Sequence, residues 1–109
     1  MGYHVRITGQ CNRATIHEAR KLFESQLHLS LKQDESDSWG GVHYTYNSNQ
    51  LTVMLIKNRD LTDDALFEEF PVGAVLLSMS FLDKKEHDRL KAAINNCDLT
   101  GTVVEDISD

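Results

Sequence analysis

The sequence predicts a single α+β domain over residues 1–109, with a mixed β-sheet and helices packed mainly on one face. Several short segments alternate apolar and polar residues, which is typical of strands. Two other segments place apolar residues at helical spacing behind a capping signal. A hydrophobic content of 40% over 109 residues suits one core without a metal or a disulfide. The expected order is β-α-β-β-(short α)-β-α-β, and the ferredoxin-like sheet is one arrangement that fits it.

The first strand is predicted over residues 3–8, where every second side chain is apolar. Thr15 and Glu18 then form a capping box that starts a helix over residues 16–26. Its apolar stripe consists of Ile16, Ala19, Phe23 and Leu27. The alternation that continues to Leu31 fits either a helix end or a short strand, and residues 32–41 are expected to form a loop.

Residues 42–46 and 51–56 contain strand-forming side chains on either side of an Asn- and Ser-rich turn, which predicts a hairpin. A helix of about two turns is predicted next, between Leu61 and Pro71. Thr62 is its expected N-cap, Leu61 and Leu66 form a hydrophobic staple, and the two acidic residues that follow Thr62 favour a helix start.

The last third of the chain predicts a strand, a helix and a final strand. Residues 74–82 are apolar on both faces, as in a covered central strand. A second capping signal at 83–86 starts a helix that ends at 95–96, with Leu90, Ala93, Ile94 and Cys97 facing inward. Residues 102–107 follow as an edge strand whose acids discourage further pairing. This strand-helix-strand unit is expected to cross over right-handedly.

Acidic side chains are segregated along the chain. Twelve of the 17 Asp and Glu residues fall in the stretches 33–37, 60–70 and 98–109, which contain no Lys or Arg. The other five acidic residues and all 11 basic ones leave +6 elsewhere, although the net charge is −6. Such segregation predicts a surface that attracts partners of opposite charge.

Several function classes find no support in the sequence. The longest nearly apolar run, 72–82, falls short of the roughly 20 residues of a membrane span, and no secretory signal opens the sequence, so a cytoplasmic protein is expected. The charge argues against direct nucleic-acid binding. The five histidines have no metal-binding spacing, and no calcium loop, catalytic motif or cofactor motif occurs. Cys11 and Cys97 form no CxxC and are expected to be reduced thiols. Neither a metal, a cofactor nor an enzymatic activity is therefore expected.

The remaining hypothesis is a recognition surface. Trp39 follows the first acidic stretch, and Tyr44 lies in the hairpin that comes next. Aromatic side chains anchor interfaces, and acidic rims accelerate association with basic partners. We therefore expect a small acidic inhibitor that occludes a basic protein, such as a nuclease toxin, as immunity proteins, antitoxins and phage-encoded inhibitors do. The expected contacts are Trp39 and Tyr44 as anchors and Asp34, Glu35, Asp37, Asp60, Asp63, Asp64, Glu68 and Glu69 as charged groups.

Other interpretations stay open at this point. Trp39 could cap the core while the acids only keep the chain soluble, and Asp63 and Asp64 could serve the helix dipole alone. A small-ligand sensor or regulatory subunit with a ferredoxin-like sheet, with its ligand at a homodimer interface, is the alternative function. An enzyme that uses His43 with neighbouring carboxylates is the third.

Overall fold

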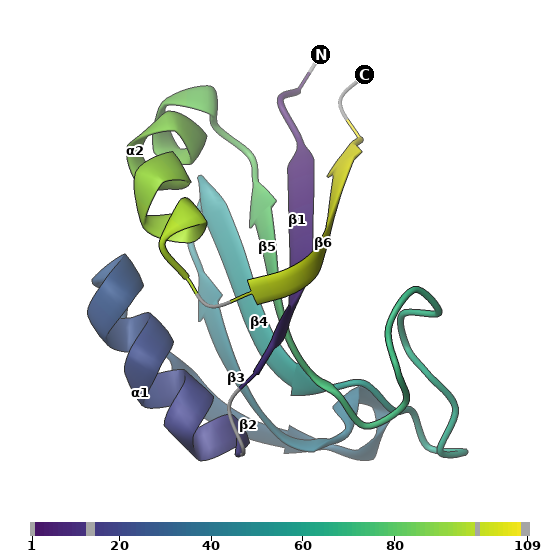
Figure 1. Cartoon of the computed structure of the whole chain (residues 1–109). Coiled ribbons are helices and arrows are strands. Elements are labelled where there is room, and N and C mark those ends of the chain that lie inside the picture. Colours follow the sequence, from purple (N-terminus) through teal and green to yellow (C-terminus); the bar gives the residue numbers. More distant parts are fainter. Residues whose placement is uncertain (1, 13–14, 98, 108–109) are drawn as a thin grey trace.

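Six strands form one open sheet in the computed structural model of this chain, and two helices lie on one of its faces (Figure 1). The structure describes residues 2–12, 15–97 and 99–107. The strands are β1 (Val5–Cys11), β2 (Lys32–Ser36), β3 (Gly41–Asn47), β4 (Leu51–Lys57), β5 (Val75–Phe81) and β6 (Leu99–Asp106). The helices are α1 (Ile16–Leu27), α2 (Lys84–Asn95) and the short 3₁₀ turn η1 (Asp37–Trp39). The α+β class is confirmed.

The predicted mixed, ferredoxin-like sheet is wrong. The strand order is β2-β3-β4-β5-β1-β6, and every neighbouring pair is antiparallel. Strands β5 and β6, which precede and follow α2 in the sequence, do run in the same direction. Each is antiparallel to β1, which lies between them in the sheet. Hydrophobic periodicity identifies strands but does not show which strand inserts between two others. The strand order could therefore not be predicted from the sequence.

The main core lies between the helices and the sheet. Leu51, Val53 and Leu55 of β4 are fully buried on the helix side, while alternate residues face the other way. The predicted stripe of α1 is buried as expected, from Ile16 to Leu27. Each fully buried side chain of this size stabilises the fold by roughly 2 kcal/mol.

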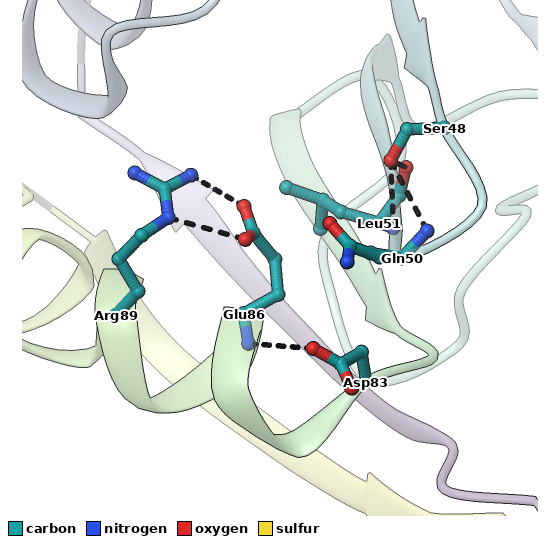
Figure 2. A network of polar contacts seen from close by, with 6 residues as sticks. All are labelled: Ser48, Gln50, Leu51, Asp83, Glu86 and Arg89. Carbon is teal, nitrogen blue, oxygen red and sulfur yellow. Dashed lines mark hydrogen bonds and ion pairs between the residues drawn. The ribbon is translucent and has the colours of Figure 1, made fainter.

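Two of the three predicted helix starts are confirmed, those of α1 and α2. The Thr15 hydroxyl accepts a hydrogen bond from the Glu18 amide at 3.1 Å. A carboxylate oxygen of Asp83 accepts one from the Glu86 amide at 3.1 Å, and the Glu86 carboxylate pairs with Arg89 one turn later (Figure 2). These caps satisfy amides that would otherwise lack partners in the first turn.

The predicted hairpin is confirmed as β3 and β4. Its turn depends on Ser48, whose hydroxyl accepts hydrogen bonds from the amides of Gln50 at 3.2 Å and Leu51 at 3.1 Å (Figure 2). The Ser48 amide also donates to the Leu51 carbonyl at 2.9 Å. The side chain therefore supplies the turn geometry that Asn-Gly dipeptides supply in tighter hairpins.

The loop predicted over residues 32–41 is wrong in its first half. Residues 32–36 form the edge strand β2, paired with β3 from Lys32 opposite Thr45 to Ser36 opposite Gly41. Its first four residues are exposed, so the strand has no apolar face to reveal it in the sequence. Acidic side chains on an edge strand discourage pairing with a second molecule, which gives Asp34 and Glu35 a structural role.

The short helix predicted between Leu61 and Pro71 is also wrong. Residues 58–74 contain neither helix nor strand. The Asp60 side chain takes up the local amides instead: one of its oxygens accepts hydrogen bonds from the Thr62 amide at 2.7 Å and the Asp64 amide at 3.1 Å. Side-chain to backbone bonds of this kind compete with helix formation, and Asp63 has the left-handed φ of 61° that ends any helical run.

One buried side chain orders the whole segment. Asn58 is fully buried at the end of β4, and its amide nitrogen lies 3.0 Å from each of the carbonyl oxygens of Phe67, Phe70 and Pro71. Its carbonyl oxygen accepts a hydrogen bond from the Phe67 amide at 2.8 Å. Its backbone bonds to Ala74 and Gly73 close the segment at its other end. Asn58 thus replaces the hydrogen bonding that a helix would have supplied.

We expect Asn58→Ala to destabilise the protein by about 3 kcal/mol, because it leaves one amide and several carbonyls around residues 67–71 without their partner. Urea unfolding measures the loss, and hydrogen exchange should show faster exchange at Phe67 and Gly73. The matched control is Asn49→Ala in the exposed hairpin turn, which should change stability by less than about 0.5 kcal/mol. Equal stability of the two variants would contradict the role assigned to Asn58.

The edge role of β2 gives a second expectation. The double substitution Asp34→Thr and Glu35→Val should increase self-association, because it removes the charge from an open strand edge. Sedimentation velocity over a concentration series measures this. The control, Glu18→Gln with Asp88→Asn on exposed helix positions, removes the same charge and should associate no more than the parent protein. Indistinguishable behaviour of the two variants would refute the edge role.

Candidate functional site

Residues 58–74 cover part of the sheet face that carries no helix (Figure 1). Phe70 packs there with Ile56 and Leu76 in a second buried cluster. The outer side of the segment is in solvent, where Leu61 and Val72 are 68% and 58% exposed. Long ordered segments without secondary structure are commonly binding elements, so the surface around this segment is the candidate site.

A hollow of about 480 Å³, which we term the Trp39 hollow, lies between this segment and the sheet. Its lining residues are Arg6, Trp39, Ala65, Leu66, Phe67, Glu68 and Glu69. Trp39 remains 38% exposed, so its indole does not simply cap the core. The Trp39 hollow therefore joins the predicted aromatic anchor to two of the predicted acidic contacts.

Arg6 lines the Trp39 hollow and forms an ion pair with Glu105 of the last acidic stretch. Its Nε and one terminal guanidinium nitrogen both donate to one carboxylate oxygen of Glu105, at 3.0 and 2.8 Å. The guanidinium carbon also lies 5.6 Å from the centroid of the Phe67 ring. The charge of Arg6 is thus already balanced by Glu105 and by the aromatic face.

A second hollow of about 170 Å³, the Asp37 hollow, lies beside the first stretch of acid. Its lining residues are Asp37, Gly40, Gly41, Arg59, Asp60, Leu61 and Asp63. Arg59 is its cation, and its guanidinium lies 4.0 Å from an Asp63 oxygen in an exposed pair. Acidic residues from the stretches 33–37 and 60–70, which the β3–β4 hairpin separates in the sequence, therefore line the same hollow.

Gly40 makes this meeting possible. It has a left-handed φ of 77°, and a Cβ atom at this position would lie 2.5 Å from the carbonyl oxygen of Lys57. Only glycine accommodates both the backbone conformation and the close approach. The approach holds η1, with Asp37 and Trp39, against the end of β4 where residues 58–74 begin.

Asp60 has a lowered pKa. The hydroxyl of Thr62 donates to it at 2.7 Å, and this bond, followed by those from the Thr62 and Asp64 amides, lowers the pKa of Asp60 below its ordinary value. Hydrogen bonds that favour the carboxylate have this sign. Asp60 is therefore charged and already hydrogen-bonded, so it shapes the turn as well as adding charge.

Two predicted residues lie away from the surface. Tyr44 is fully buried beneath α1, where its hydroxyl meets His17 and the Arg20 guanidinium lies 4.8 Å from its ring centroid. It is therefore a core residue and not an exposed anchor. His43 is also buried, and its Nδ1 is 3.0 Å from the Gly41 carbonyl oxygen, which places it behind the surface and not in either hollow.

The other predicted acids are exposed but do not line the hollows. Asp34 and Glu35 lie on β2, and one Asp64 oxygen accepts from the Thr62 hydroxyl at 3.0 Å. Of the last acidic stretch, Glu105 reaches the site through Arg6, whereas Asp98 and Asp109 lie outside the described residues. The structure thus assembles Asp37, Trp39, Asp60, Asp63, Glu68 and Glu69 and leaves the remaining predicted contacts apart.

Metal and thiol chemistry find no support at this surface. No group of three His, Cys, Asp or Glu side chains suited to a metal ion occurs within the described residues. Cys11 and Cys97 are buried on the helix side and are not joined by a disulfide. Burial, and to a lesser extent the neighbouring Cys11, raises the pKa of the Cys97 thiol to about 11, so it is protonated at neutral pH.

A third hollow of about 300 Å³ lies on the helix side, between α2 and β6. Ile7, Ile94 and the exposed Val104 give it an apolar lining, with His87 and Lys91 at the helix. It shares no residue with the acidic surface, so it is a separate feature of the fold.

Sequence reasoning missed four residues that shape the site. The contacts of Arg6 and Asn58 were not predicted, because their partners lie far away in the sequence. Leu61 and Val72 were read as parts of a helix and of an apolar run, yet both are exposed. Asn58 directly follows a strand of apolar residues, and this position was the only signal that could have indicated a buried polar group.

No protein-family model matches this chain, and no curated protein is similar to it in sequence. Within the described part of the chain, no helix is long and apolar enough to cross a membrane.

The lowered pKa of Asp60 leads to a prediction about acid. Because the hydrogen bonds favour the carboxylate in the folded state, the turn is stabilised above the unfolded pKa and loses this contribution as the pH falls through the lower folded pKa. The NMR amide shifts of Thr62 and Asp64 should therefore titrate together, with a midpoint below the ordinary pKa of an aspartate in an unfolded peptide. Asp60→Asn should abolish this titration. A midpoint at or above the ordinary aspartate pKa in the parent protein would contradict the assignment.

Proposed function

We propose that this chain is a small acidic inhibitor that binds a basic protein, such as a nuclease toxin, through η1 and residues 58–74. It acts by covering the functional surface of that partner. The observation that supports this most directly is the convergence of separate acidic stretches around the exposed Trp39. Aromatic anchors within an acidic rim suit a positively charged partner.

The charges of this surface favour a cationic partner. Its carboxylates outnumber its cations, and both of its arginines have an acidic neighbour within 4.0 Å. Six carboxylates against two guanidinium groups leave a formal −4, the members being Asp37, Asp60, Asp63, Glu68, Glu69 and Glu105 against Arg6 and Arg59. A field of one sign raises the rate of encounter with a basic partner and weakens with salt.

Apolar contact area is available at the same surface. Trp39, Leu61 and Val72 are all exposed large side chains. Specific interfaces combine a desolvated apolar centre with a polar rim, and charge alone gives on-rate more than affinity. The three side chains give this surface the apolar part of such an interface.

Inhibition follows from occlusion. A basic cleft that binds nucleic-acid phosphates presents clustered Lys and Arg side chains, and an acidic surface competes for the same groups. The sheet supports this surface, and the two helices lie on the opposite face of the sheet (Figure 1). This mechanism requires neither a metal nor a reactive side chain.

The test is quantitative affinity purification from the native source with three baits: the parent protein, Glu68→Gln with Glu69→Gln, and Glu18→Gln with Asp88→Asn. The parent and the helix-side control should retain a basic protein in stoichiometric amount at low salt. The Glu68/Glu69 variant should retain at least about five-fold less of it, and 0.5 M salt should release it from all baits.

Two outcomes would refute the proposal. One is that all three baits retain the same proteins in equal amount, and the other is that the retained protein is not basic. The two double variants remove the same charge from exposed positions, so a difference between them reports position and not net charge.

A further inference from the structure

We infer that the Trp39 hollow binds the guanidinium group of an arginine side chain presented by the partner protein. The inference rests on the proposed function and adds the chemical group that the hollow recognises. It is derived from the contacts of Arg6, from the free carboxylates of Glu68 and Glu69, and from the exposure of Trp39.

The hollow already contains one guanidinium held in this manner. Arg6 lies 5.6 Å from the Phe67 ring centroid and donates twice to Glu105, at 3.0 and 2.8 Å. An aromatic face together with a carboxylate is the pairing that planar guanidinium groups favour. One side of the Trp39 hollow therefore demonstrates the chemistry with a residue of this chain.

The lining of the hollow contains further groups of the same kinds, and these have no cation. Trp39 supplies the aromatic surface, and Glu68 and Glu69 supply two carboxylates. Neither carboxylate has a hydrogen bond or an ion pair with any described residue. Among the lining residues Arg6 is the only cation, and Glu105 already neutralises it. The hollow thus retains a formal charge of −2, and it is also lined by Trp39, whose indole is the strongest cation–π partner among the side chains.

Arginine fits this arrangement better than lysine. Its flat group stacks on an indole and offers a fork of N–H donors to carboxylates, and it sheds water more readily than an ammonium group. A lysine ammonium would gain the charge attraction but not the stacking or the paired donors. The hollow should therefore distinguish two peptides of equal charge.

Trp39 is the only tryptophan of the chain, so its fluorescence reports this site alone. The probes are triarginine amide, trilysine amide and tricitrulline amide, added to the full chain at constant ionic strength. Triarginine should change the emission at a concentration at least about three-fold lower than trilysine, and tricitrulline should have no effect. Circular dichroism confirms that each variant is folded.

The double variant Glu68→Gln with Glu69→Gln should raise the midpoint concentration for triarginine at least about three-fold. The control Glu18→Gln with Asp88→Asn should leave it unchanged. Equal midpoints for triarginine and trilysine, no fluorescence change, or an equal loss in both double variants would overturn the inference. A basic partner captured by charge, together with no preference for arginine, would refute this inference and leave the proposed function standing.

Discussion

The buried amide of Asn58 is the interaction on which the candidate surface depends. A polar side chain without contact to water is stable only when its hydrogen bonds are satisfied, and Asn58 satisfies them with backbone groups of Phe67, Phe70 and Pro71. One side chain thereby holds a segment that has no helix or strand. Because the backbone is held from inside, the segment can expose Leu61 and carry acid outward without losing its shape.

The acidic side chains of this chain have different physical roles. Asp83 caps a helix, and Asp60 closes a turn. These structural roles alone explain an acidic or polar side chain at both positions, whether or not the protein binds a partner. The two outer strands β2 and β6 carry further acids that discourage edge pairing. Among the carboxylates of the candidate surface, three have no such role: Glu68 and Glu69 line the Trp39 hollow, and Asp37 lies in η1 together with Trp39. The set of acidic residues that we propose as partner contacts is therefore smaller than the charge pattern alone indicates.

Three local signals in the sequence were reliable, whereas the predicted Thr62 cap failed because the Asp60 side chain binds the nearby amides instead. The caps at Thr15 and Asp83 and the hairpin turn at Ser48 act within a few residues, and each formed as predicted. The misassigned segments follow a different rule. Strand β2 exists because β3 offers it a partner, and residues 58–74 avoid a helix because Asp60 and Asn58, both outside the predicted helix, bind their backbone. The strand order likewise depends on contacts between distant segments, and no window of the sequence contains them.

The two walls of the surface are fixed independently before any partner arrives. Gly40 allows η1 to press against Lys57, and the hydrogen bonds of Asn58 fix the segment that follows. Binding to a surface prepared in this way loses little backbone entropy, so the free energy of ordering does not offset the contacts that form. In the proposed complex, attraction between charges governs how often the partners meet, while the contacts of Trp39 govern how long they stay bound. In the proposed function, the carboxylates near one partly exposed indole therefore separate two tasks, which are fast capture and slow release.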